Sequence, residues 1–171
     1  MLTYVTFYPY FRKRKETGDI QMHAKPITDI KAISKPITKI AIALDFCGNE
    51  ESLISAAIRQ GSQGQEFVLI HVVESPSAIF HGIHTDDFET QQDRERLNYY
   101  VAQLIESGYN TKGVLGYRDT ASEITRIASE ENADLLVMGA HGHKGIKDFI
   151  FGTTIDKVRH QVKIPVLIVG S

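Results

Sequence analysis

The chain has 171 residues, a formal net charge of −2 and 42% hydrophobic residues. This length can enclose a substantial core in one domain, and the small negative charge argues against general binding to nucleic acid. The single cysteine excludes an internal disulfide bond and fits a reducing compartment. No apolar run approaches the roughly 20 residues that span a bilayer. We therefore expect a cytoplasmic protein with no nucleic-acid partner.

The first 36 residues differ in composition from the rest of the chain. Five aromatic residues within positions 4–11 precede four consecutive cations, Arg12 to Lys15, and the sequence is polar from there to Pro36. Aromatic side chains beside a basic run are typical of segments at a membrane interface. We predict an N-terminal segment and linker at residues 1–36, followed by one domain at residues 37–171. For residues 1–15 a disordered leader and membrane contact are both open, and contact would tether the protein at the inner face of the membrane.

Regular patterns begin at Ile37, where residues 37–45 form a short apolar run that predicts a strand buried on both faces of a parallel sheet. A helix follows, and residues 66–74 predict the second strand. The next helix has apolar residues at spacings of three and four, so that they lie on one face. The residues that line these two helices are Leu53, Ala56, Ala57 and Ile58 in the first, and Leu97, Tyr100, Val101, Leu104 and Ile105 in the second.

The second half of the domain continues this alternation. Residues 111–117 predict the third strand, and Thr120 and Glu123 have the spacing of a capping box at the start of the third helix. Residues 133–140 predict the fourth strand, a last helix follows, and residues 164–171 predict the fifth strand. The alternation predicts an α/β fold with a doubly wound parallel sheet and helices on both faces. Such folds bind ligands beyond the carboxyl ends of their strands.

A glycine-rich loop follows the fourth strand. Gly139 and Gly142 lie at its start, and Gly152 precedes Thr153, where the last helix should begin. Glycines let main-chain amides approach phosphate oxygens closely, and a helix start offers N–H groups and the positive end of its dipole. The loop therefore predicts a phosphate site, although it is neither a Walker A loop nor a G-x-G-x-x-G motif. The alternative that stays open is a glycine-rich turn before a capped helix.

Three histidines could in principle bind a metal or take part in catalysis, but the surrounding sequence favours neither role. His81 and His84 have the spacing of metal ligands, but they lie in a predicted polar loop without another obvious ligand, so we predict no metal-binding residue. His71, inside the second strand, is predicted to be a core histidine with a hydrogen-bonded ring. Neither a Ser/His/Asp order nor a catalytic pair of carboxylates can be recognised, so we predict no catalytic residue.

The loop also resembles a family motif. Gly139-x-x-Gly142, nine residues and Gly152-Thr153 reproduce the G-2x-G-9x-G-[ST] motif of the nucleotide-binding branch of the universal stress protein family. The runs IALDFC, LIHVVE and IPVLIVGS are similar to that family too, and the resemblance covers roughly residues 37–171.

This resemblance implies a five-stranded sheet in the order 3-2-1-4-5, with ATP, AMP or ADP bound at the switch between the first and fourth strands. Asp45 matches the position that contacts the adenosine moiety, and Val72 matches the one whose main chain meets adenine. A bound Mg²⁺ or Mn²⁺ would be held mostly by phosphates and water. The nucleotide-binding residues that we predict are Asp45, Val72, Met138, Gly139, His141, Gly142, Gly152, Thr153 and Thr154.

The resemblance further implies a homodimer formed through the C-terminal strand. It points to a stress-response or regulatory domain that senses ATP or AMP rather than to an enzyme. Two alternatives stay open. One is the cytoplasmic regulatory tail of a membrane transporter, which the N-terminal segment would suit, and the other is a weak ATPase.

Overall fold

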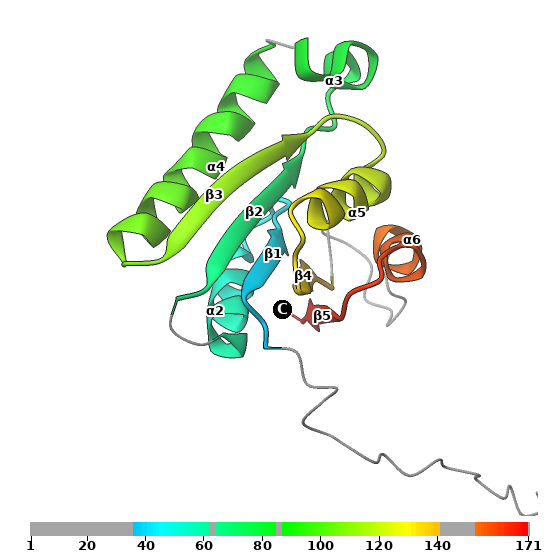
Figure 1. The fold of residues 1–171 in the computed structure, drawn as a ribbon. Coiled ribbons are helices and arrows are strands. Elements are labelled where there is room, and N and C mark those ends of the chain that lie inside the picture. Colours follow the sequence, from blue (N-terminus) through cyan, green and yellow to red (C-terminus); the bar gives the residue numbers. More distant parts are fainter. Residues whose placement is uncertain (1–35, 62–63, 85–86, 141–152, 171) are drawn as a thin grey trace, which may run out of the picture. The chain divides into compact units, whose positions relative to one another are not determined.

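The computed structural model describes residues 36–61, 64–84, 87–140 and 153–170. Five strands form one parallel sheet in the order β3-β2-β1-β4-β5 (Figure 1). The predicted fold class and strand order are therefore confirmed. The segment at residues 1–35 lies outside the described residues, and membrane contact there stays a prediction. The strands are β1 Lys39–Ala43, β2 Glu66–Val72, β3 Asn110–Gly116, β4 Leu135–Gly139 and β5 Val166–Val169.

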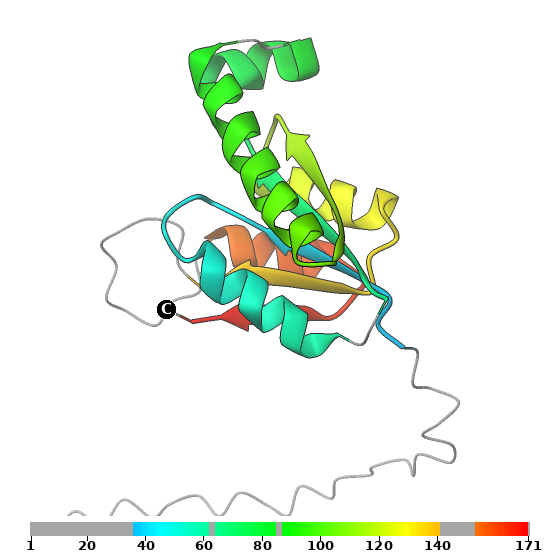
Figure 2. The ribbon, with the colours of Figure 1, turned by 90° about the vertical axis from the view of Figure 1, so that its left-hand side faces the viewer.

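Two pairs of helices cover the two faces of the sheet (Figure 2). One face carries α2 Glu50–Gln60 and α4 Phe88–Glu106, and the other carries α5 Thr120–Glu130 and α6 Thr153–Gln161. This arrangement is the doubly wound one that the sequence predicts, because the crossovers lie on one face from β1 to β3 and on the other face from β3 to β5, after the strand order reverses. Within the described part of the chain, no helix is long and apolar enough to cross a membrane.

Each central strand supplies side chains to both cores, because successive side chains point to opposite faces. In β1, Ile40 and Ile42 pack with residues of α2 and α4, whereas Ala41 packs with residues of α5 and α6. All three are fully buried. Burying a side chain such as isoleucine contributes roughly 1.5–3 kcal/mol to the stability of the fold. The contacts of β1 with both helix layers therefore hold this short strand, and its carboxyl end, in place.

A short helical segment stands where the sequence predicts a polar loop. It comprises α3 Pro76–His81 and the 3-10 helix η1 Gly82–His84. Ser75 starts α3, because its hydroxyl oxygen accepts a hydrogen bond from an N–H of the first turn at 3.0 Å. The loop prediction for His81 and His84 is therefore wrong. Among the residues that the structure describes, no group of three His, Cys, Asp or Glu side chains could hold a metal ion.

Two local predictions on the helices are also wrong. Asp119, not Thr120, is the N-cap of α5, and its carboxylate accepts a hydrogen bond from the N–H of Ser122 at 3.0 Å. Aspartate is at least as good an N-cap as threonine, and its charge suits the positive end of the helix. Near the end of α4, Leu104 is buried but Ile105 is 54% exposed, so the apolar face of this helix is narrower than predicted.

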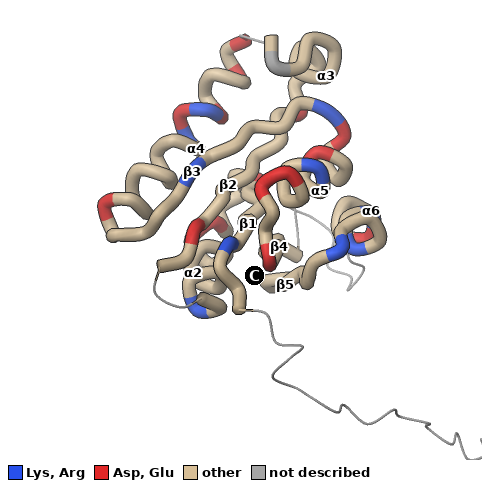
Figure 3. Tube along the Cα trace, viewed as in Figure 1, with Lys and Arg blue, Asp and Glu red and all other residues tan. Residues whose placement is uncertain are grey.

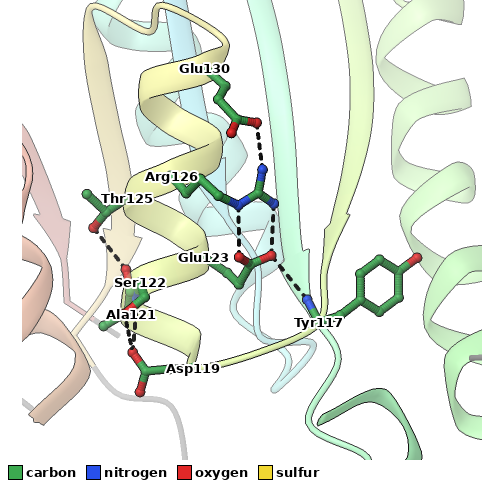
Figure 4. A network of polar contacts seen from close by, with 8 residues as sticks. All are labelled: Tyr117, Asp119, Ala121, Ser122, Glu123, Thr125, Arg126 and Glu130. Atoms are coloured by element: carbon green, nitrogen blue, oxygen red, sulfur yellow. Dashed lines mark hydrogen bonds and ion pairs between the residues drawn. The ribbon is translucent and has the colours of Figure 1, made fainter. Parts of the chain in front are cut away.

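Glu123 holds the turn between β3 and α5 instead of closing a capping box (Figure 4). Its Oε2 accepts a hydrogen bond from the N–H of Tyr117 at 3.3 Å, and its two oxygens accept from the guanidinium of Arg126 at 2.8 Å each. Arg126 also donates to the exposed Glu130 at 2.6 Å. The Arg126 guanidinium, and after it the Tyr117 N–H, lower the pKa of the buried Glu123 carboxyl.

Glu123→Ala is expected to lower the free energy of unfolding at pH 7 by about 1–3 kcal/mol, because it leaves the backbone N–H of Tyr117 and two of the three donating nitrogens of Arg126 without their acceptor. The matched change Glu130→Ala removes only the exposed partner of Arg126 and should cost less than about 0.5 kcal/mol. Since the pKa of Glu123 is lowered on folding, its contribution is present above the unfolded value of about 4.3 and is lost as the pH falls through the folded value.

Urea unfolding of both variants at pH 7 and near pH 3 measures these effects. The deficit of Glu123→Ala relative to the wild type should shrink at the lower pH. Equal losses in the two variants at pH 7 would contradict the role given to Glu123.

Candidate functional site

The carboxyl ends of the three central strands lie at different heights. The last residues that pair β1 with β2 are Ala43 and Ile70, but β2 continues to Val72. On the other side, β1 last pairs with β4 at Val137, and β4 continues to Gly139. The short β1 thus ends between two longer neighbours, at the point where the strand order reverses. We call this region the stepped edge; it consists of Asp45, Val72, Met138 and Gly139.

The main chain of Val72 faces this step. The carbonyl oxygen of Ile70 accepts a hydrogen bond from Leu44 of the β1 side at 2.8 Å, whereas the N–H of Val73 donates to Gly116 of the β3 side at 2.9 Å. Backbone groups of successive strand residues point to alternate neighbours. Those of Val72 therefore point to the β1 side, beyond the last paired residues of β1. An N–H and a C=O in this position can recognise the polar edge of a planar base.

Asp45 begins the turn that ends β1. Its Oδ1 accepts a hydrogen bond from the N–H of Cys47 at 3.2 Å, so the half-buried carboxylate helps to shape its own turn. Phe46 follows with a φ of 56° and Gly48 with a φ of 95°. A positive φ is rare for a bulky side chain, and the chain leaves the sheet here instead of extending β1.

The start of α6 approaches the same edge from the other side. α6 is described from Thr153, and its residue Ile155 packs in the same core cluster as Val72 and Met138. Because α6 follows a parallel strand and returns to another one, its first turn lies at the carboxyl edge of the sheet. The first turn of a helix presents N–H groups and a positive dipole end. Of the predicted site residues, His141, Gly142 and Gly152 lie outside the described residues.

Two surface hollows flank the stepped edge. The first, of about 650 Å³, lies beyond the ends of β2 and β3. In it, the hydroxyl of Thr120 donates to Glu74 at 2.9 Å, and the lining also includes Ile79, Arg118 and Asp119. The second, of about 400 Å³, lies between the start of α2 and α4. Its lining residues are Phe46, Gly48, Glu50, Glu95, Arg96, Tyr99 and Tyr100.

Sequence patterns did not indicate Phe46 and Arg96 as residues around the site. Phe46 lies under the guanidinium of Arg96, whose central carbon is 5.9 Å from the ring centroid. An arginine on an exposed helix face gives no signal in the sequence, because such residues are common and solvated. Cys47 is exposed, yet partial burial of the thiol, followed by the nearby carboxylates of Asp45 and Glu50, raises its pKa. At neutral pH the thiol is therefore protonated and is a poor nucleophile.

The amino-acid sequence of this chain is similar to those of known proteins. The model of the universal stress protein family matches residues 36–170. Universal stress protein MJ0577 of Methanocaldococcus jannaschii is 22% identical over 126 residues, which are 63% of this chain and 78% of that protein. Universal stress protein Sll1388 of Synechocystis sp. is 30% identical over 148 residues, which are 77% of this chain and 96% of that protein.

Solved structures show the same fold. The structure of hypothetical protein MJ0577 superposes with a TM-score of 0.67 at 23% identity and covers 80% of this chain and 98% of its own. A universal stress protein from Archaeoglobus fulgidus in complex with dAMP has a TM-score of 0.59 at 20% identity, with 78% and 98% covered. A universal stress protein in complex with cAMP has a TM-score of 0.55 at 17% identity, with 80% and 98% covered.

Proposed function

The chain belongs to the universal stress protein family, and on that premise we propose that it binds an adenine nucleotide, ATP or AMP, at the stepped edge and is regulated by it. The observation that carries this proposal is the length of β1, which ends before both of its neighbours. Open α/β sheets bind ligands where the strand order reverses. Two structures of similar fold are complexes with dAMP and cAMP, which supports an adenine nucleotide as the ligand class.

Each part of the nucleotide has a chemically suitable partner in this proposal. The main chain of Val72 would meet the edge of the adenine, and the carboxylate of Asp45 would accept hydrogen bonds from the ribose hydroxyls. The first turn of α6, at Thr153 and Thr154, would receive phosphate oxygens through its N–H groups and hydroxyls. His141, Gly142 and Gly152 are proposed phosphate contacts on the strength of the family motif alone. Met138 and Gly139 would flank the ribose and phosphates.

We propose that Mg²⁺ or Mn²⁺ enters with the phosphates and not through a protein cage. Mg²⁺ usually keeps several water ligands and is bound by substrate phosphates. The described part of the chain has no cluster of three candidate ligands, which is compatible with that mode. Calorimetric titration with ATP in the presence and absence of Mg²⁺ would show whether the metal contributes.

The bound nucleotide is proposed to act as a signal and not as a substrate for turnover. Proteins of this family are generally regulatory, and the one thiol beside the site is protonated at neutral pH because its pKa is raised. A weak ATPase is the alternative. Release of phosphate from bound ATP, followed over hours in single-turnover conditions, separates slow hydrolysis from simple binding.

The test of the proposed function starts with the purified protein. Mass spectrometry of the material released on denaturation is expected to find an adenine nucleotide. Calorimetry of nucleotide-free protein should show ATP binding at least tenfold tighter than GTP binding, about 1.4 kcal/mol, because guanine presents a different pattern of donors and acceptors to a backbone edge. Failure to bind ATP or AMP, or equal affinity for GTP, would contradict the proposal.

A homodimer through β5 is the second part of the proposal, and the two edges of the sheet differ in a way that supports it. Among the strands that the structure describes, β5 pairs only with β4, and it carries no charged residue (Figure 3). Its four apolar side chains are only partly buried. The opposite edge, β3, carries Lys112, which forms ion pairs with Glu66 and Glu131. Charged residues on an edge strand discourage pairing, and bare apolar edges invite it. We also propose a cytoplasmic location, which fits the amino-acid composition and the single cysteine of the chain.

A further inference from the structure

His71 occupies β2 one residue before the stepped edge, and both nitrogens of its ring face oxygen atoms. Nδ1 lies 2.8 Å from the carbonyl oxygen of Leu44, and Nε2 lies 3.1 Å from Oδ2 of Asp93 in α4. A carbonyl oxygen only accepts hydrogen bonds, so Nδ1 carries a hydrogen and donates it. Nε2 faces the carboxylate of Asp93, with which it forms an ion pair when the ring is protonated. The His71 side chain is only 10% exposed, so these contacts are largely shielded from water.

The flat face of the same ring supports the next turn of the chain. The ring of Phe46 stacks on that of His71, with centroids 4.1 Å apart and an angle of 26° between the planes. Phe46 is the bulky residue with a φ of 56°, a conformation that persists only when its surroundings hold it. The His71 side chain thus contacts both Leu44, the residue before Asp45, and Phe46, the residue after it.

From these contacts we propose that His71 is a positioning residue for the stepped edge. Its Nδ1–H holds the Leu44 carbonyl and its ring face holds Phe46, so that the Asp45 carboxylate points in one direction. Asp93 orients the ring from α4, which links the outer helix to the site. The effect on nucleotide affinity rests on the proposed function, because it requires Asp45 to contact the ligand. The effect on the turn does not.

A matched pair of variants separates the two hydrogen bonds. In His71→Asn, the amide nitrogen lies close to the position of Nδ1 and can donate to the Leu44 carbonyl, but it cannot reach Asp93. In His71→Gln, the longer side chain brings its amide to the position of Nε2 and leaves no donor for Leu44. Both variants lose the aromatic stack with Phe46 and both are neutral. The direction of the difference therefore shows which bond matters more: a larger effect in His71→Gln points to the bond with Leu44, and a larger effect in His71→Asn points to the contact with Asp93.

Two measurements on the full chain are made for the wild type and both variants. The first is hydrogen–deuterium exchange in peptides that cover residues 44–48, without nucleotide. His71→Gln is expected to exchange at least fivefold faster there than His71→Asn. The second is calorimetric titration with ATP, in which His71→Gln should bind at least tenfold more weakly than the wild type and His71→Asn should stay within about threefold. Urea unfolding gives the stability of each variant.

The outcomes distinguish the inference from the proposed function. If the wild type does not bind ATP, the proposed function fails, and the exchange comparison alone decides the role of His71. If the wild type binds ATP and the two variants have equal exchange and equal affinity, the positioning role is overturned. The positioning role is also overturned if the changes in exchange and in ATP affinity are simply proportional to the loss of unfolding stability in both variants. If His71→Gln does not fold, retained affinity and slow exchange in His71→Asn still support the role, and their loss there overturns it.

Discussion

Asp45→Ala is expected to weaken ATP binding by at least tenfold, or about 1.4 kcal/mol. Asp45 follows β1 at the stepped edge, and its carboxylate is half-buried. Hydrogen bonds that involve a charged group contribute roughly 1.5–3 kcal/mol each, so the loss of a ribose contact alone can account for the decrease. Titration calorimetry of nucleotide-free wild type and variant measures it.

The matched variant Asp45→Asn tells the two roles of this side chain apart. Its amide oxygen can still accept the hydrogen bond that Cys47 donates to Oδ1 at 3.2 Å, so the turn is kept while the charge is lost. We expect its affinity for ATP to lie between those of the wild type and Asp45→Ala. Wild-type affinity in both variants would place the ribose away from Asp45.

Ile168→Pro is expected to convert the proposed dimer into monomers. The carbonyl oxygens of Pro165 and Val169 accept hydrogen bonds from Leu136 of β4 at 3.0 Å and from Ala140, just after β4, at 2.8 Å. Because strand residues alternate in direction, the backbone of Ile168 faces away from β4, toward a partner strand. Proline removes its N–H and obstructs pairing at that edge, while the ladder to β4 keeps all its donors. Light scattering at several protein concentrations measures the oligomeric state.

Ile168→Ala is the control, since it removes the side chain but keeps the N–H. It should stay dimeric, or weaken the dimer much less than proline does. Thermal unfolding of the monomeric variant should show that the fold persists. A dimer that survives Ile168→Pro, or one that is equally weakened by both changes, would mean that β5 backbone pairing does not form the interface.

The strands and their grouping were predictable because burial on both faces leaves a strong pattern. Runs such as residues 66–74 contain few polar residues, and alternation with helical stripes leaves few topologies. Strand order came only with the family resemblance. Short segments between the strands gave much less information about secondary structure. Residues 76–84 contain proline and glycine, which are typical of a loop. In the structure a short helix begins there, and the hydroxyl of Ser75 caps it.

The candidate site was predictable in part and for a different reason. The motif and the family indicated Asp45 and Val72, but the sequence contains no signal for how far β2 and β4 extend past β1, because register depends on which residues pair across the sheet. The same limit applies to His71. Its burial could be anticipated from the strand, whereas its contacts with Leu44 and Asp93 join residues that are 27 and 22 positions away.

The short β1 has a consequence for how such a site can be inherited. If the ligand is recognised where one strand stops before its neighbours, the property resides in a length and in main-chain atoms, and most side chains around it are free to change. That would let the sequence of such a domain diverge widely without rebuilding the site. The events that create or abolish it would then be insertions and deletions near residues 44–48, which a position-by-position comparison of amino-acid types does not register.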